Sequence, residues 1–222
     1  MRRPAALLLD IDGTLVDSRD AVERTWRQVA AEFGVPVEPI LAICHGRRDD
    51  DVVPQFFAPA RVATVMARLT ALETAYLNLV RPVPGAAEVL AGWVPHPWAA
   101  VTSGPRTLMR GRLGSAGLPV PRVLVSAEDV ARGKPDPEGF TRAAAALGVR
   151  SADCVVVEDS PAGVVAGRAA GAYVVAITTT HRASDLGGAD AVIDGWAEFR
   201  ALAAPPSGAS AGRRTPPDRP AR

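Results

Sequence analysis

The chain has 222 residues, of which 48% are hydrophobic and 22% are charged, a composition that fits a folded globular domain and excludes wholesale disorder. Its 25 basic and 24 acidic residues give a formal net charge of +1, so no overall field attracts nucleic acid or a membrane surface. The two cysteines, Cys44 and Cys154, are far apart and lack metal-ligand spacing, which argues against a disulfide scaffold and a zinc module. We therefore expect a cytoplasmic protein without nucleic-acid or membrane partners.

Short apolar runs, rich in β-branched residues, alternate with helical stretches along the chain. Several of these runs are apolar throughout, as strands are when both faces of a parallel sheet are covered. Strands are predicted over Ala5–Leu9, Trp98–Val101, Arg122–Val125, Cys154–Val157, Tyr173–Ile177 and Ala191–Ile193. Helices are predicted over Pro84–Trp93, Pro105–Ala116, Pro137–Leu147 and Pro161–Ala170. This alternation predicts the α/β class, with a doubly wound, Rossmann-like parallel sheet and right-handed crossovers.

One interval departs from this alternation. Between Ser18 and Arg81 no strand is predicted, whereas Ala21–Phe33 and Ala60–Leu79 have helical periodicity. The interval is too long for a crossover, so we predict a small helical cap over residues 18–81, inserted after the first strand. Residues 1–17 and 82–204 would then form the core. Residues 205–222 contain five Pro and four Arg against one Asp and are predicted to be a disordered tail.

The first predicted strand runs directly into the acidic segment Asp10-Ile11-Asp12-Gly13-Thr14. Residues two apart in an extended chain point the same way, so Asp10 and Asp12 can face one site. Two carboxylates this close repel each other unless a cation or a proton lies between them, and Mg²⁺ is a hard ion that prefers oxygen ligands. A polar strand end with one Asp capping a helix is the alternative for this segment taken alone.

Two further segments supply groups suited to an anion. Thr102 and Ser103 follow a predicted strand and precede a helix, whose N-terminal N–H groups and dipole favour a phosphate; an ordinary helix cap is the alternative. Lys134 is the single lysine among 25 basic residues and lies in a loop with two prolines. Because a compact ammonium differs from a planar guanidinium, its position favours a point charge facing a phosphate oxygen or an aspartyl nucleophile. Chance retention of one lysine is the alternative.

The fourth segment ends an unbroken apolar strand with two adjacent acids, Glu158 and Asp159. Carboxylates at the end of a buried strand are unfavourable unless a cation or hydrogen-bond donors satisfy them. Both acids are therefore candidate metal ligands, and the alternative is that Asp159 or Ser160 caps the next helix. All four segments fall at the C-terminal edge of the predicted sheet, where open α/β sheets bind ligands.

The order Asp-x-Asp-Gly-Thr, Thr-Ser, Lys and Glu-Asp resembles the haloacid dehalogenase-like hydrolase superfamily, over nearly the whole chain up to about Asp194. The helical insertion is similar to the small cap of the phosphatase and phosphomutase branch of that superfamily. Within the branch, the cap segment His45-Gly46-Arg47-Arg48 and the segments around Thr102 and Glu158 resemble the glycerol-phosphate and sugar-phosphate phosphatases.

The resemblance implies a role for each motif residue. Asp10 would attack the phosphorus atom of the substrate and become an aspartyl phosphate. Asp12 would protonate the leaving group and then activate water, and its backbone carbonyl would also bind Mg²⁺. Thr102 and the Ser103 amide would hold phosphate oxygens, while Lys134 would offset the charge of the nucleophile and the phosphoryl group. The implied magnesium ligands are Asp10, Asp12, Glu158 and Asp159.

In the predicted cap, His45, Arg47 and Arg48 are candidates for contacting the organic part of the substrate or excluding water. A salt-bridged helix end, facing the acids at positions 49–51, is the alternative for the two arginines. Arg106, after the Thr-Ser-Gly turn, is a further candidate anion contact. His96 and His181 have no motif around them and are expected at the surface.

Three functions are compatible with these residues. The first is a Mg²⁺-dependent phosphatase, a monomer or weak dimer, acting on a small phosphorylated sugar or polyol. The second is a sugar phosphomutase of the β-phosphoglucomutase type, and the third is a receiver-like phosphate-sensing module, for which the chain is too long. In the mutase family a cap histidine aligns the acid/base Asp, and the matching position here is the apolar Val22; with a shifted alignment Asp17, Asp20 or Glu23 could orient it. We therefore expect a phosphatase.

Overall fold

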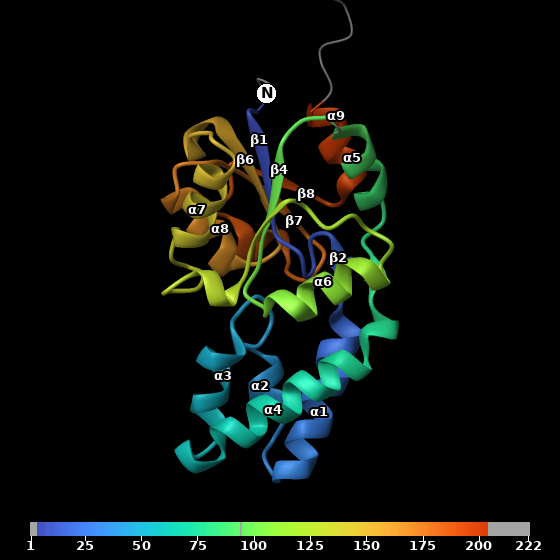
Figure 1. The fold of residues 1–222 in the computed structure, drawn as a ribbon, viewed down its shortest axis with the longest axis vertical. Coiled ribbons are helices and arrows are strands. Elements are labelled where there is room, and N and C mark those ends of the chain that lie inside the picture. The colour runs from blue at the N-terminus through green and yellow to red at the C-terminus, as the bar shows by residue number, and fades with distance from the viewer. Residues whose placement is uncertain (1–3, 94, 204–222) are drawn as a thin grey trace, which may run out of the picture.

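A computed structural model describes residues 4–93 and 95–203 of the chain. Within these residues, parallel strands form a six-stranded sheet in the order β5-β4-β1-β6-β7-β8 (Figure 1). The strands are β1 (Ala6–Leu9), β4 (Trp98–Val101), β5 (Val123–Val125), β6 (Cys154–Glu158), β7 (Tyr173–Ile177) and β8 (Ala191–Ile193). Each lies within one residue of its predicted bounds, and the doubly wound α/β class is confirmed.

Helices cover both faces of this sheet (Figure 1). Along β1, Leu7 and Leu9 enter the hydrophobic core on one face, whereas Ala6 and Leu8 enter the core on the other. Successive side chains of a strand point to opposite faces, so a strand covered on both sides is apolar at every position. One face packs against α5 (Ala86–Trp93), α6 (Arg106–Ser115) and α9 (Trp196–Ala203), and the other against α7 (Glu138–Ala146) and α8 (Pro161–Ala169).

Between β2 and β3 the chain forms four α-helices, the α1–α4 bundle, which lies beyond the carboxyl end of the sheet (Figure 1). The bundle has its own hydrophobic core, in which Trp26 and Val29 of α1 pack with Val65 and Leu69 of α4. The two chain segments that lead into and out of it pair as a short antiparallel ribbon, with Val16 opposite Pro82. The elements are α1 (Arg19–Phe33), α2 (Glu38–Leu41), α3 (Asp49–Phe56), α4 (Pro59–Ala75), β2 (Val16–Asp17) and β3 (Arg81–Pro82).

Some details of this region differ from the sequence predictions. Strand β3 begins at Arg81, inside the interval for which no strand is predicted, because two residues are too few to show alternation and Pro82 disfavours a strand. The predicted helix Ala60–Leu79 ends at Ala75 and is followed by a 3₁₀ turn, η1 (Leu77–Leu79). Helices α2 and α3 are additional to the predicted ones.

The predicted tail, residues 205–222, lies outside the described residues. In the described part of the chain, none of the helices combines the length and the hydropathy that a membrane span requires.

Trp196 connects the last helix to the turn that follows β1. Its side chain is fully buried, and the indole Nε1 donates a hydrogen bond of 2.8 Å to the carbonyl oxygen of Thr14. Its ring also packs edge-on against Phe199, with ring centroids 5.2 Å apart. Gly85 (φ +89°) approaches so closely that a Cβ there would lie 2.9 Å from the Cβ of Trp196. Helix α9 therefore helps to fix the turn immediately after the acidic segment of β1.

Substitution of Trp196 tests this support. In Trp196→Phe the carbonyl of Thr14 loses its donor in a buried position, and we expect the free energy of unfolding to fall by about 1–3 kcal/mol, measured by urea denaturation. Tyr173→Phe, which alters a side chain that is 40% exposed, is the control and should change stability by less than about 0.5 kcal/mol. An unchanged urea midpoint for Trp196→Phe would show that the bond to Thr14 contributes nothing.

Candidate active site

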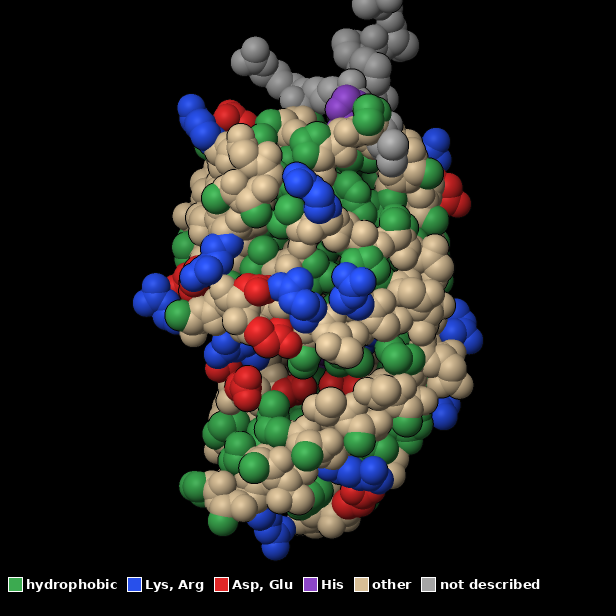
Figure 2. All heavy atoms as spheres, in the orientation of Figure 1, with side chains coloured by type: hydrophobic (Ala, Val, Ile, Leu, Met, Phe, Trp, Pro, Cys, Tyr) green, Lys and Arg blue, Asp and Glu red, His purple; other side chains and the backbone are tan. Residues whose placement is uncertain are grey.

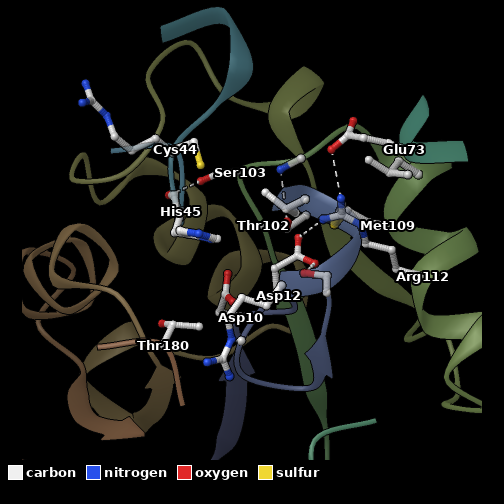
Figure 3. Close-up of a pocket in the computed structure, with 18 of the residues that line it drawn as sticks. Asp10, Asp12, Cys44, His45, Glu73, Thr102, Ser103, Met109, Arg112 and Thr180 are labelled. Carbon is white, nitrogen blue, oxygen red and sulfur yellow. Dashed lines mark hydrogen bonds and ion pairs between the residues drawn. The ribbon is translucent and has the colours of Figure 1, made fainter. Parts of the chain in front are cut away.

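The carboxyl ends of three adjacent strands carry polar residues that line one pocket. Asp10 follows β1, Thr102 follows β4 and Asp159 follows β6. Strand β1 has β4 on one side and β6 on the other, so the strand order reverses at this point, and open α/β sheets bind ligands where that happens. The α1–α4 bundle supplies the opposite wall through Val22, Trp26, Cys44, His45, Asp49 and Glu73 (Figure 3).

Lys134 lies buried between two carboxylates. Its Nζ donates to Oδ1 of Asp10 at 2.5 Å and also to Oε1 of Glu158, and its side chain is 6% exposed. Burial alone would lower the pKa of Lys134, but the negative charges of Asp10 and Glu158 raise the pKa above its ordinary value. The ammonium is therefore charged, and the sequence-predicted Asp10, Lys134 and Glu158 form one hydrogen-bonded group.

The acids of this group are crowded. Burial raises the pKa of Asp10 from 3.8 to about 7; the charge of Lys134 opposes that shift and the neighbouring Glu158 adds to it. Burial and the same neighbour also raise the pKa of Asp159 well above its usual range. One ammonium is thus too little positive charge for the carboxylates of the site, which favours protonation or the binding of a further cation.

The three acids have the arrangement that a hard cation requires. Asp10, Glu158 and Asp159 each offer a carboxylate oxygen, and these oxygens lie within 4.8 Å of one another. Oδ2 of Asp10 is buried and has no hydrogen-bond partner among the described residues, so it is available to a ligand. An all-oxygen, negatively charged set is the chemistry that Mg²⁺ prefers. The residues present therefore fit a divalent cation.

Glu158 differs from the other two acids because both of its oxygens are already engaged. Oε1 accepts from Lys134, while Oε2 accepts from the backbone N–H groups of Asp159 and Ser160 at 3.0 and 2.9 Å and from the Ser160 hydroxyl. Gly163 of α8 approaches so closely that a Cβ there would lie 1.9 Å from the Glu158 carboxyl. The start of α8 is therefore shaped around this carboxylate, and Ser160, rather than Asp159, caps the helix.

Asp12 faces the bundle side of the pocket. Its Oδ1 accepts a hydrogen bond of 2.7 Å from the hydroxyl of Ser18, the residue before α1, and its Oδ2 lies 2.7 Å from Nη1 of Arg112 in α6. Nη2 of the same guanidinium lies 2.9 Å from Oε1 of Glu73 in α4. Figure 3 shows these three charged side chains following one another along the pocket wall. Neither Arg112 nor Glu73 belongs to a motif that predicted the site.

The loop between α2 and α3 reaches the end of the sheet. Its Gly46 carbonyl accepts a hydrogen bond of 3.0 Å from the hydroxyl of Ser103, and a Cβ on Gly46 (φ +74°) would lie 2.8 Å from the Cβ of Ser160. A side chain at position 46 would therefore separate the bundle from the sheet. Next to it, His45 lines the pocket, and burial lowers the pKa of its imidazole, which favours the neutral form.

The three arginines that were predicted to contact the substrate have different surroundings. Arg47 is exposed and lines the pocket. Arg48 is outside this lining, because it forms an ion pair of 3.2 Å with Asp51 and packs beside Gly133. Arg106 is also outside it: its guanidinium pairs with Asp129. The structure thus brings one of the three arginines to the pocket.

A loop after β7 contributes residues that no sequence motif indicated. The hydroxyl of Thr180 donates to Oδ2 of Asp159, and Nδ1 of His181 lies 3.0 Å from the carbonyl oxygen of the same aspartate. His181, expected at the surface, is therefore partly buried against the site. Thr180 also lines the pocket beside Asp10 (Figure 3).

Comparison with known proteins agrees with the geometry of the fold and site. A sequence model of the haloacid dehalogenase-like hydrolase family matches residues 4–171. Hexitol phosphatase A of Escherichia coli (strain K12) is 40% identical over 196 residues, covering 86% of this chain and 91% of that protein. Validoxylamine A 7'-phosphate phosphatase of Streptomyces hygroscopicus subsp. limoneus is 36% identical over 202 residues, covering 87% and 94%.

Among solved structures, a family hydrolase from Deinococcus radiodurans R1 with bound phosphate and sodium aligns with a TM-score of 0.70 at 32% identity, covering 91% of this chain and 96% of that chain. The chain belongs to the haloacid dehalogenase-like hydrolases and, within them, to the phosphatases, which confirms the resemblance carried by its four motifs.

The raised pKa of Asp10 predicts how stability depends on pH. Because the folded-state pKa is about 7 against 3.8, the folded protein holds this proton more tightly than the unfolded chain. The contribution of Asp10 therefore destabilises the fold progressively as the pH rises from about 4 to about 7. In buffer with a chelator, Asp10→Asn should melt at a higher temperature than the wild type at pH 8, and the difference should shrink toward pH 4.

Differential scanning calorimetry across this pH range measures the effect. Asp153→Asn, which removes an exposed carboxylate at the other end of β6, should follow the wild-type curve. A constant difference in melting temperature between Asp10→Asn and the wild type at all pH values would contradict the assignment.

Proposed function

We propose that this chain is a Mg²⁺-dependent phosphatase that hydrolyses a small phosphorylated sugar or polyol through an aspartyl-phosphate intermediate. The observation that carries the proposal is the state of Asp10, a buried carboxylate with one oxygen held by Lys134 and the other without a partner among the described residues. Thr102 and Asp159 meet it at the same edge of the sheet. The phosphatase relatives support the reaction class, and their names support a polyol or sugar phosphate.

In the first step a carboxylate oxygen of Asp10 bonds to the phosphorus atom while the ester P–O bond breaks. Asp12 transfers its proton to the departing alkoxide, so the organic product leaves as an alcohol. In the second step water attacks the same phosphorus, Asp12 takes a proton from that water, and the acyl–phosphate bond breaks. Inorganic phosphate is released, and Asp10 and Asp12 return to their starting forms. The covalent intermediate divides one difficult displacement into two.

Phosphoryl transfer depends mainly on positioning and on stabilisation of negative charge. Lys134 places an ammonium beside Asp10, and Thr102 lies just before α6, where free N–H groups can hold phosphate oxygens. Asp10, Asp159 and the carbonyl of Asp12 would hold Mg²⁺, which when bound supplies further positive charge beside the phosphoryl group. Glu158, with both oxygens engaged, would act chiefly by fixing Lys134.

The two alternatives are less well supported. At the position where the mutase family has an aligning histidine, the apolar Val22 lines the pocket. Asp12 is held by Ser18 and Arg112. None of the three acids considered for orienting it, Asp17, Asp20 and Glu23, is hydrogen-bonded to it in the described residues. A receiver-like module has no use for the α1–α4 bundle, which forms one wall of the pocket. Water is therefore the proposed acceptor of the phosphoryl group.

Phosphorus NMR distinguishes hydrolysis from isomerisation. With Mg²⁺ and a panel of sugar and polyol phosphates, we expect net release of inorganic phosphate and negligible conversion of β-glucose 1-phosphate to glucose 6-phosphate. Asp10→Asn keeps the size of the side chain but removes the attacking charge, so release should fall by at least about 10⁴-fold. Isomerisation that outpaces phosphate release would reverse the assignment, and near-normal turnover by Asp10→Asn would exclude the covalent mechanism.

The dependence on Mg²⁺ is tested at Asp159. Asp159→Ala removes a proposed direct ligand, so the Mg²⁺ concentration for half-maximal activity should rise by at least about 100-fold. The shift in melting temperature on adding Mg²⁺ should also disappear. Asp153→Ala, at the opposite end of β6, should change neither quantity. Full wild-type activity in excess chelator would overturn the proposed metal site.

A further inference from the structure

The pocket wall that faces away from Asp10 carries a buried guanidinium surrounded by acids. Arg112 is 4% exposed, and its two terminal nitrogens pair with Asp12 and with Glu73. Its third nitrogen, Nε, is buried without a hydrogen-bond partner among the described residues. Asp49, the first residue of α3, lines the same pocket and is close enough for its charge to interact with that of Arg112. These residues are called the Arg112 wall: Asp12, Asp49, Glu73 and Arg112.

The Arg112 wall places three carboxyl groups around one cation, so its negative charge exceeds its positive charge once these groups are ionised. Burial raises the pKa of Glu73 to about 8 and that of Asp49 to about 6, although the charge of Arg112 opposes both shifts. On the face drawn in Figure 2, acidic side chains also gather along the boundary between the sheet-bearing part and the bundle. The other arginines of the described lining, Arg19 and Arg47, are exposed, where salt screens their charge. An additional anion beside this wall would therefore be repelled.

The position of the wall relates it to the leaving group. In the proposed reaction Asp12 protonates the oxygen that leaves, so the organic part of the substrate must lie beside Asp12. The ion pair from Asp12 to Arg112 and on to Glu73 extends from that point into the bundle. The carbon chain of the leaving group therefore passes along the Arg112 wall, whereas the phosphate stays with Lys134 and Thr102.

The polar atoms of the wall match hydroxyl groups. Carboxylates accept hydrogen bonds, and the unpartnered N–H of Arg112 donates one. A hydroxyl both donates and accepts, whereas a carboxylate or phosphate of a ligand can only accept. We propose that Asp49 and Glu73, held around Arg112, are specificity-determining residues that select a neutral, polyhydroxylated leaving group and disfavour one that carries a second anion. This inference rests on the proposed phosphatase function and assigns its substrate class.

A pair of substrates that differ at one carbon tests the inference. Glucitol 6-phosphate ends in CH₂OH where 6-phosphogluconate ends in a carboxylate, and the rest of the two molecules is the same. For the wild-type enzyme with Mg²⁺ at pH 9, where Glu73 and Asp49 are both ionised, we expect kcat/KM for phosphate release to favour the neutral member by about 100-fold, the order of effect that a like-charge contact in a partly desolvated site produces. Most of the difference should appear in KM.

Two isosteric variants locate the effect. At pH 9, above the raised pKa values of about 8 and about 6, Glu73→Gln and Asp49→Asn each remove one negative charge, so each should lower the preference for the neutral substrate by about tenfold. Asp50→Asn, at the exposed neighbouring position of α3, is the matched control and should keep the wild-type preference. The ratio of the two kcat/KM values is informative because a general loss of folded enzyme lowers both equally. Should Glu73→Gln fail to fold, Asp49→Asn decides alone.

The outcomes separate the inference from the proposed function. Phosphate release from both substrates at equal kcat/KM would overturn the inference and leave the phosphatase function intact. A preference that persists unchanged in both variants would also overturn it, because the selectivity would then arise elsewhere. Release from neither substrate, together with no release from the panel of sugar and polyol phosphates, would reject the proposed phosphatase and the inference with it.

Discussion

The placement of one ammonium between two buried carboxylates is the constraint on which the rest of the site depends. Lys134 is held by Asp10 and Glu158, and each of the three comes from a different part of the chain: β1, the loop before α7 and the end of β6. Buried charges are tolerated only when they are paired and hydrogen-bonded. The site therefore exists only when the parallel sheet has brought those strand ends together.

The burial of these carboxylates also explains which backbone groups and which glycines lie beside them. Glu158 is fully buried, and it is stabilised by the N–H groups at the start of α8 and by the Ser160 hydroxyl. Gly163 lies where any side chain would collide with that carboxylate. Gly13, after β1, is similarly close to Asp159, because a Cβ there would lie 2.0 Å from its Oδ2. The absence of a side chain at Gly13 and at Gly163 thus leaves room for the carboxylates of Asp159 and Glu158.

The sequence was sufficient to predict the strands of the sheet and the charged residues that lie close to Asp10. Strands buried on both faces are apolar at every position, so β1 and β6 were recognisable without knowledge of their partners. Asp10 and Asp159 stood out because they directly follow such strands. Lys134 stood out because it is the single lysine among 25 basic residues. The short ribbon of β2 and β3 was missed because each strand has two residues, too few for a pattern.

Arg112 illustrates what a local pattern cannot supply. It lies three and four residues after Met109 and Leu108, on the apolar face of α6, so the helical periodicity alone marks it as a charge on a buried face. Its partners could not have been found in this way, because Glu73 is 39 residues earlier and in a different part of the fold. Pairing of this kind is a product of tertiary packing.

The ion pair between Arg112 and Glu73 also crosses the boundary between the sheet-bearing part and the α1–α4 bundle. The two parts are encoded by separate stretches of the chain, yet they share this contact. A bundle exchanged with that of a relative would bring its own residue to position 73, while the guanidinium would stay behind with α6. The residues of the bundle and the residue at position 112 must therefore be compatible with each other, although they are not contiguous in the sequence.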